Sequence, residues 1–210
     1  MRDWLKQLRE PLTVVTGLLF LATLALYCST RDLVKGAERT AERQLCAFVF
    51  LTGTGIIEKK NGKDILAVAH FKNFGQTPAY NMKIYGKMAV GDYPLRKKLP
   101  ALVFSVDRSS ESIGPTDTRD QYQTLTALPS GEKDAVIAKR SAIYLYGTLF
   151  YRDAFGKARC TAYRFFYVGQ PLVVDVDNLP SHSVDGSPMG VAQEGNQTEQ
   201  DTNSADCEPQ

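Results

Sequence analysis

The segments SAIYLYGTLFYR (141–152) and KARCTAYRFFYV (157–168) flank the short sequence DAFG (153–156). The flanks are rich in Tyr, Phe, Ile and Thr, which are typical of strands, and Asp and Gly between them are typical turn residues. We therefore predict a long antiparallel hairpin. With a loop over 153–156, Leu149 faces Cys160, and the opposite side collects Tyr144, Tyr146, Phe150, Tyr163 and Phe165. This aromatic face could be a binding patch, and the simpler interpretation is cross-strand aromatic packing.

The same strand-like composition extends over residues 44–176, with turn signals at short intervals. Asn61-Gly62 is a strong hairpin signal, Gly53–Gly55 indicates a bend between two strands, and 108–120 resembles a polar loop. We expect about seven or eight short strands, one of them over 102–107 and another over 121–128, and one short helix over 130–139. This pattern, without alternating long helices, predicts a mainly β domain built as an antiparallel β-sandwich.

Two turns contain residues whose chemistry suits a fixed backbone. In NFGQTP (73–78), Asn73 can bond its own turn, Gly75 permits a positive φ, and Pro78 fixes φ at the exit. Asp153 and Gly156 play matching parts in the second hairpin. We expect these side chains to specify the fold rather than bind a ligand. The predicted structural turn residues are Asn73, Gly75, Thr77, Pro78, Asp153 and Gly156.

An apolar run, Leu12–Cys28 (LTVVTGLLFLATLALYC), contains no charged residue. Pro11 precedes it, at a position that suits the first turn of a helix. The run approaches the roughly 20 residues that cross a bilayer core. We therefore predict a short N-terminal tail (1–10) and one transmembrane helix (11–28), with the lipid bilayer as its partner.

Two processing events compete with an uncleaved anchor. A charged start before an apolar stretch also fits a secretory signal peptide, and Cys28 could be the lipidated residue of a lipoprotein. Both cleavage reactions favour a small residue just before the cut, where Tyr27 stands. Basic residues flank both ends of the run, so the positive-inside rule does not set the orientation. A short tail ahead of a single span favours an extracytoplasmic domain.

The net charge of +2 conceals regions of different character. Residues 29–43 are typical of a solvated helical stalk, and residues 44–176 carry an excess of Lys and Arg. Residues 177–210 are rich in Ser, Gly, Gln and Asn and have no basic residue, so we predict a disordered acidic tail. With 43% hydrophobic and 23% charged residues, the whole chain is neither disordered nor a multi-span membrane protein.

The two histidines, His70 and His182, limit the chemistry that the sequence supports. Zinc-ligand spacings, HExxH, GxSxG and phosphate-binding loops are all missing. A Ser-His-Asp triad would have to use His70, and a histidine within a strand is more often structural. We therefore expect no enzyme activity, no metal site and no cofactor.

Four cysteines are present, at positions 28, 46, 160 and 207, and their spacings match neither a metal site nor a redox motif. Cys46 and Cys160 lie in the first and last strong strands. In an oxidising compartment they could pair across the sandwich. The alternative is two buried thiols, which behave as small hydrophobic groups.

Two basic clusters are visible, and each could contact anionic lipid headgroups or an acidic partner. The simpler interpretation is a solvated hairpin tip and a solvated loop. No nucleic-acid-binding motif accompanies the charge, so we expect no nucleic acid partner. Asn196-Gln197-Thr198 matches a glycosylation sequon, which is a short and common motif. The clusters consist of Lys59, Lys60 and Lys63, and of Arg96, Lys97 and Lys98.

The sequence contains the segment NFGQTPA (73–79) and, later, IYLYG (143–147) leading into YRDAFG (151–156). This combination of motifs is similar to one in a known group of proteins. After one N-terminal span, it resembles a group of uncharacterised single-span bacterial membrane proteins, and its first turn resembles those of bacterial immunoglobulin-like modules. The resemblance implies an immunoglobulin-like sandwich and does not point to any particular activity. In that group a cysteine often ends the returning strand. Here Cys160 comes earlier, and Phe166-Tyr167 occupies that place.

Together these features predict a membrane-anchored, non-enzymatic interaction or structural module, with a protein as a candidate partner. We expect a single-pass protein of the bacterial inner membrane with its domain outside the cytoplasm. The alternative is a module that binds a ligand or anionic lipid at the membrane surface. Neither the specific partner nor the oligomeric state follows from the sequence.

Overall fold

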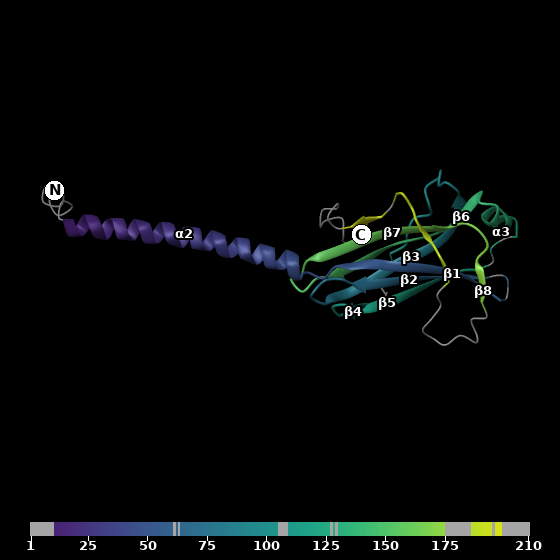
Figure 1. Cartoon of the computed structure of the whole chain (residues 1–210), viewed down its shortest axis with the longest axis horizontal. Helices are drawn as coiled ribbons and strands as arrows, with labels where there is room; N and C mark the ends of the chain where they lie inside the picture. Colours follow the sequence, from purple (N-terminus) through teal and green to yellow (C-terminus); the bar gives the residue numbers. More distant parts are fainter. Residues whose placement is uncertain are drawn as a thin grey trace. The chain divides into compact units, whose positions relative to one another are not determined.

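The computed structural model describes residues 11–60, 62, 64–104, 109–126, 128, 130–174, 186–194 and 196–198. The chain divides into two units, Met1–Leu45 and Cys46–Gln210. The first consists of one helix and the second is a β domain (Figure 1).

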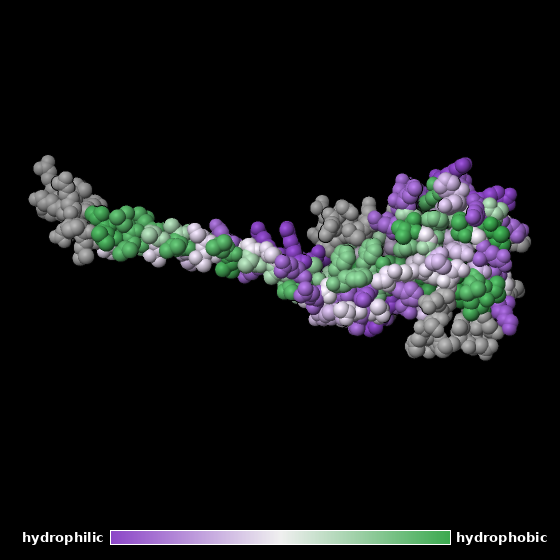
Figure 2. All heavy atoms as spheres, viewed as in Figure 1, coloured by the Kyte–Doolittle hydropathy of each residue, from purple (hydrophilic) through white to green (hydrophobic). Residues whose placement is uncertain are grey.

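Helix α2 spans Pro11–Leu45 and continues without a break from the apolar run into the polar stalk. Figure 2 shows hydrophobic residues in its first part and hydrophilic residues towards its C-terminal end. Within the apolar part, the hydroxyl of Thr23 donates to the carbonyl of Leu19 (2.7 Å), which satisfies this polar group without water. The helix is long and apolar enough to cross a membrane.

The β domain contains two sheets, and every described strand pairing is antiparallel except that of β1 with β8. The predicted mainly β fold after one helix is confirmed. The first sheet has the order β5-β2-β1-β8, with β9 also on β1, and comprises β1 (Val49–Lys59), β2 (Ile65–Asn73), β5 (Thr118–Leu125), β8 (Leu172–Val174) and β9 (Ser187–Pro188).

The second sheet has the order β10-β7-β6-β3-β4, with β11 also on β7. A short helix, α3 (Ser130–Ile137), lies at the end of the domain where β6 begins (Figure 1). The strands of this sheet are β3 (Ala79–Asp92), β4 (Glu111–Ile113), β6 (Ser141–Arg152), β7 (Ala158–Tyr167), β10 (Gly190–Val191) and β11 (Gln197–Thr198).

The main core lies between the two sheets. Strand alternation places Ile143, Leu145 and Leu149 of β6 in this core, all fully buried. Polar contacts also join the sheets, since the hydroxyl of Thr161 donates to the carbonyl of Val49 (3.1 Å). The two layers therefore form a β-sandwich.

A second, smaller apolar cluster covers the outer face of β6. Tyr144 and Tyr146 point to this face and pack against leucines of the loop that follows β3. Their hydroxyls donate to the carbonyls of Asp92 (2.8 Å) and Pro100 (2.7 Å). These bonds hold the loop over residues 93–104 against the outside of the second sheet.

The hairpin of β6 and β7 has a longer loop than predicted. Arg152 pairs with Ala158, so the loop covers residues 153–157, and it closes through a bond from the Asp153 amide to the Lys157 carbonyl (3.0 Å). The predicted register was wrong by one residue, and such a slip exchanges the two faces of a strand. Cys160 therefore pairs with Phe150 instead of Leu149. Tyr163 and Phe165 belong to the core instead of the outer face.

Other differences concern strand boundaries. The predicted bend at Gly53–Gly55 is a register shift inside the single strand β1, between Leu51 and Gly53. The predicted polar loop over 108–120 contains β4 and the start of β5. Of the strand predicted over 102–107, residues 102–104 are not in a strand, and the rest lies outside the described residues.

The disorder predicted for residues 177–210 is wrong for the part of this segment that the structure describes, 186–194 and 196–198. These residues contribute β9 to the first sheet and β10 and β11 to the second. Met189 enters the main core with only 8% of its surface exposed. We call residues 190–194 and 196–198 the strap, because β10 and β11 within them pair with β7.

Candidate functional site

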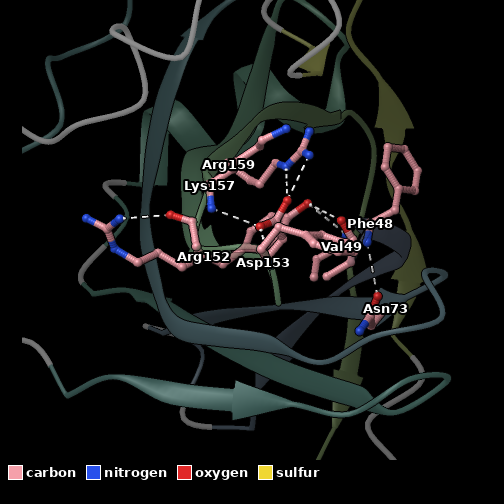
Figure 3. Close-up of polar contacts among 11 residues, drawn as sticks. Phe48, Val49, Asn73, Arg152, Asp153, Lys157 and Arg159 are labelled. Atoms are coloured by element: carbon pink, nitrogen blue, oxygen red, sulfur yellow. Dashed lines mark hydrogen bonds and ion pairs between the residues drawn. The ribbon is translucent and has the colours of Figure 1, made fainter. Parts of the chain in front are cut away.

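The turn residue Asn73 is fully buried and joins separate parts of the domain. Its Oδ1 accepts from the amides of Gly75 (2.9 Å) and Phe48 (3.1 Å), the latter shown in Figure 3. Its Nδ2 donates to the carbonyls of Thr77 (2.8 Å) and Ile113 (3.4 Å). Asn73 thus connects its own turn to the start of β1 and to β4, and Pro78 leads from this turn into β3.

Gly75 is required in the same turn for a reason other than the predicted one. Its φ does not lie in the left-handed region, so the expected positive φ is wrong. A Cβ atom here would come within 2.2 Å of the Cys46 carbonyl oxygen and 2.6 Å of the Ala47 Cα. Gly75 therefore allows the chain entering the domain to pass directly over the turn.

Asp153 organises the second turn (Figure 3). Its Oδ1 accepts from the amides of Phe155 (3.0 Å) and Lys157 (2.9 Å), and its Oδ2 pairs with the Arg159 guanidinium at 2.8 and 2.9 Å. Gly156 has a φ of +76°, which favours glycine at this position. All these partners lie within the hairpin, so the arrangement has a structural role.

The possible pairing of Cys46 with Cys160 does not occur, and the alternative of two thiols outside any disulfide holds for Cys46 alone. Cys160 is disulfide-bonded, whereas Cys46 keeps its thiol and takes part in no disulfide bond. Thr161 of β7 directs its hydroxyl to the Val49 carbonyl of β1. Its neighbour Cys160 must point to the opposite, outer face of β7, away from the strand that follows Cys46. Cys28 also keeps its thiol.

The two basic clusters belong to different sheets. Lys59 ends β1 and Lys60 follows it in the turn that leads to β2, while Lys63 lies outside the described residues. The other three, Arg96, Lys97 and Lys98, are exposed in the loop over the outer face of the second sheet. No contact between the clusters is found among the residues described.

His70 lies on β2 and contacts Asp120 of β5 (Nδ1 to Oδ1, 2.7 Å), with the two side chains 31% and 36% exposed. Two neighbouring strands hold the pair, since His70 and Asp120 face each other in register. This half-exposed position on a sheet surface is typical of a structural histidine.

The outer face of β6 and β7 contains a recess of about 340 Å³, within the size range of small-molecule sites. Its floor comes from Tyr144, Arg164 and Phe166. The loop after β3 provides one wall and the strap provides the other. The wall residues are Tyr93, Pro94 and Leu95 from the loop, and Val191, Ala192, Gln193 and Glu194 from the strap.

The loop wall is anchored to the sheet at several points. The amide of Tyr93 donates to the Arg140 carbonyl (3.1 Å), and the ring of Tyr93 lies 5.1 Å from that of Phe166. The bond from Tyr144 to the Asp92 carbonyl holds the residue just before this wall. The loop side of the recess is therefore fixed without any ligand.

The strap wall is hydrogen-bonded to β7 through the main chain of Arg164. The side chain of Asn196 makes the two hydrogen bonds that the backbone of a neighbouring strand would make. Its Oδ1 accepts from the Arg164 amide (2.8 Å), and its Nδ2 donates to the Arg164 carbonyl (3.2 Å). The same Nδ2 donates to the Ala192 carbonyl (2.8 Å), and the Ala192 amide donates to the Arg164 carbonyl (3.1 Å). The side-chain amide of Asn196, the sequon asparagine, is thus engaged in hydrogen bonds to the main chain, although the residue is exposed.

The Arg164 side chain brings a positive charge to the floor. Within the described residues its guanidinium forms no ion pair, and its buried Nε has no hydrogen-bond partner. A buried donor without a partner costs about 1–3 kcal/mol. Burial raises the pKa of Tyr144, although the nearby Arg164 acts in the opposite direction. The floor therefore combines a neutral phenol with a cation.

Of the described residues that line this recess, only Tyr144 belongs to the aromatic face considered as a binding patch from the sequence, and the others were not predicted as functional. Arg164 could not be distinguished from the many other basic residues in the sequence. The polar composition of residues 177–210 predicted disorder, so the strap was not expected. The available signal was the apolar pair Met189 and Val191 in a mostly polar segment. Comparisons with protein-family models, curated proteins and solved structures found no match to this chain.

Proposed function

We propose that this chain is a membrane-anchored, non-enzymatic binding module, in which α2 crosses the membrane and the recess over β6 and β7 takes a ligand. The observation that carries the proposal is the recess itself. Both its walls are anchored by hydrogen bonds to the sheet, and a preorganised site loses little ordering entropy on binding.

The chemistry of the recess favours binding over catalysis. The lining residues that the structure describes include no serine, cysteine, histidine or lysine. A nucleophile next to a general base is the usual arrangement for covalent catalysis. His70 and Asp120 could form such an arrangement only on β2 and β5, which belong to the other sheet.

The disulfide bond at Cys160 supports a domain outside the cytoplasm, in agreement with the orientation expected from the short N-terminal tail. Structural disulfides persist in oxidising compartments and are rare in the cytosol. We extend the proposal to a bacterial inner membrane on the resemblance alone.

The orientation can be tested with an impermeant maleimide on the exposed position of Ser110, after Ser110→Cys substitution in a chain with Cys28 and Cys46 changed to serine. We expect labelling in intact spheroplasts. Labelling only after permeabilisation would place the domain in the cytoplasm and remove the proposed role of the disulfide.

Anionic lipid is the weaker alternative ligand, because the two basic clusters lie on different sheets. A test is charge reversal at Lys59, Lys60 and Arg96–Lys98, followed by binding of the chain to anionic vesicles. Unchanged binding would exclude these clusters as a lipid site. A loss of binding would support the alternative.

Ligand binding can be tested by saturation-transfer NMR with a small-fragment library and the full chain in nanodiscs. Ala192→Trp places a bulky side chain in the recess, and Ala138→Trp places the same side chain at an exposed position beyond α3. We expect fragment signals that disappear in Ala192→Trp and persist in Ala138→Trp. An absence of hits, or hits that persist in both variants, would contradict the proposal.

A further inference from the structure

The recess contains one positive charge, on Arg164, and one carboxylate, on Glu194 of the strap wall, and no ion pair joins Arg164 to any of the residues described. The main chain of Arg164 is held by Asn196 and Ala192, which sets the position of the residue. Among the described residues, its guanidinium has no ion-pair partner and its Nε has no acceptor. A guanidinium presents parallel N–H groups that match a carboxylate.

The tyrosines beside Arg164 do not supply the missing negative charge. Tyr146 pairs with Arg164 in register, and Tyr144 is its neighbour on the same face of β6. Both hydroxyls donate to carbonyl oxygens of the loop. Burial raises the pKa of both phenols, so they remain neutral at pH 7. The tyrosines therefore leave the guanidinium of Arg164 available to an external anion.

The rest of the recess suits an apolar group attached to that anion. Phe166 and Tyr93 bring two rings together at 5.1 Å, tilted by 31°. Leu95 and Val191 add aliphatic surface from the two walls. A planar apolar body can contact these side chains while its charged end reaches Arg164.

Glu194 limits the charge of the ligand. It is exposed on the strap wall. A carboxylate at this place repels a second negative group, so a polyanion is disfavoured. A single negative charge at the end facing Arg164 avoids this repulsion.

We propose that the recess binds a small monocarboxylate with a planar apolar body, whose carboxylate pairs with Arg164 and whose body lies against Phe166 and Leu95. This inference rests on the proposed binding function and adds the chemical class of the ligand. The site requires no metal ion or cofactor for this recognition.

The test measures dissociation constants for phenylacetate, phenylacetamide and acetate with the full chain in neutral-lipid nanodiscs at pH 7. Phenylacetamide keeps the shape of phenylacetate without its charge, and acetate keeps the charge without the ring. We expect phenylacetate to bind about 10-fold or more tightly than either. Arg164→Gln should abolish the tighter binding of phenylacetate relative to phenylacetamide. Arg119→Gln, on exposed β5, should preserve this difference in affinity.

Equal affinities for phenylacetate and phenylacetamide, or an unchanged preference in Arg164→Gln, would overturn the inference. The comparison of ligands on the unmodified chain decides the question even where Arg164→Gln does not fold. Fragments that bind the recess without preference for carboxylates would overturn this inference alone. A complete absence of recess-dependent fragments would overturn the proposed function and this inference together.

Discussion

Asp153 uses one buried carboxylate to hold a loop and a neighbouring strand. One oxygen accepts two loop amides and the other pairs with Arg159, whose side chain is 18% exposed. Asn73 plays a comparable part with an uncharged amide. In both turns a short polar side chain replaces main-chain partners that the local backbone cannot provide.

Asp153→Ala should lower the free energy of unfolding by about 3 kcal/mol, because it leaves Arg159 and two loop amides without their acceptor. Arg152→Ala is the matched control and should change it by less than about 0.5 kcal/mol, since its side chain is exposed. Urea unfolding followed by far-UV circular dichroism measures both values. Equal effects of the two substitutions would contradict the role of Asp153.

Gly75→Ala should destabilise the domain by about 2–4 kcal/mol, because its Cβ would overlap the Cys46 carbonyl. Gly131→Ala, on α3 with no atom within 4 Å of the added Cβ, should be neutral or stabilise by up to about 1 kcal/mol. The same unfolding measurement compares them. A Gly75→Ala protein as stable as the parent would show that the chain entering the domain moves aside.

Local chemistry explains which residues could be predicted from the sequence. Asp153 and Gly156 act within a few residues of themselves, and Asn73 bonds Gly75 and Thr77 in its own turn, so their spacing alone indicated turns. The bonds of Asn73 to Phe48 and Ile113 join distant segments and could not be predicted in this way. The disulfide state of Cys46 depends on which face of β7 carries Cys160, which local sequence does not determine. Arg164 matters because distant segments converge on it.

At the scale of elements, the strand composition predicted most of the sandwich, and a single loop residue decided the faces of β7. Lys157 closes the loop where a four-residue turn was expected. The strap was missed because Asn196, a side chain, makes the bonds that a regular strand would make with its backbone. Polar composition alone therefore did not distinguish a docked segment from a disordered one. The immunoglobulin-like type of sandwich stays a prediction.

Asn196→Ala should release the strap from β7. We expect amide hydrogen exchange in peptides covering 190–198 to become about 10-fold faster, since the bonds to Arg164 and Ala192 are lost, while β6 stays protected. Gln193→Ala is the control on the exposed side of the strap. Unchanged exchange in Asn196→Ala would mean that the other contacts of the strap are sufficient.

The stability of the domain should fall at alkaline pH, because the phenols of Tyr144 and Tyr146 hold the loop over β6. Burial raises the pKa values of Tyr144 and Tyr146 above the ordinary value of 10.0. Their contribution to stability is present below pH 10 and is lost as the pH rises through the raised values, because the unfolded chain deprotonates first.

The double variant Tyr144→Phe, Tyr146→Phe should start from a lower stability, since it lacks two hydrogen bonds, and should decline less steeply above pH 10. Denaturant midpoints between pH 8 and pH 11 test this expectation. Identical slopes in the parent and the variant would show that these phenols do not govern the alkaline transition.

At the scale of the molecule, the chain joins a helix fit to cross a membrane to a β-sandwich with a preorganised recess. Apolar length and strand composition predicted both units, because each is a property of a continuous segment. The recess combines β6, β7, the loop after β3 and the strap, which are separated in the sequence. Its existence could be seen only after folding.

Intermolecular NOEs test whether this recess is a ligand site. The full chain in nanodiscs, with labelled Leu and Val methyl groups, is mixed with the strongest-binding fragment. We expect NOEs from the ligand to the methyl groups of Leu95 and Val191. NOEs confined to distant methyl groups, such as those of Leu172 and Val173 on β8, would contradict it.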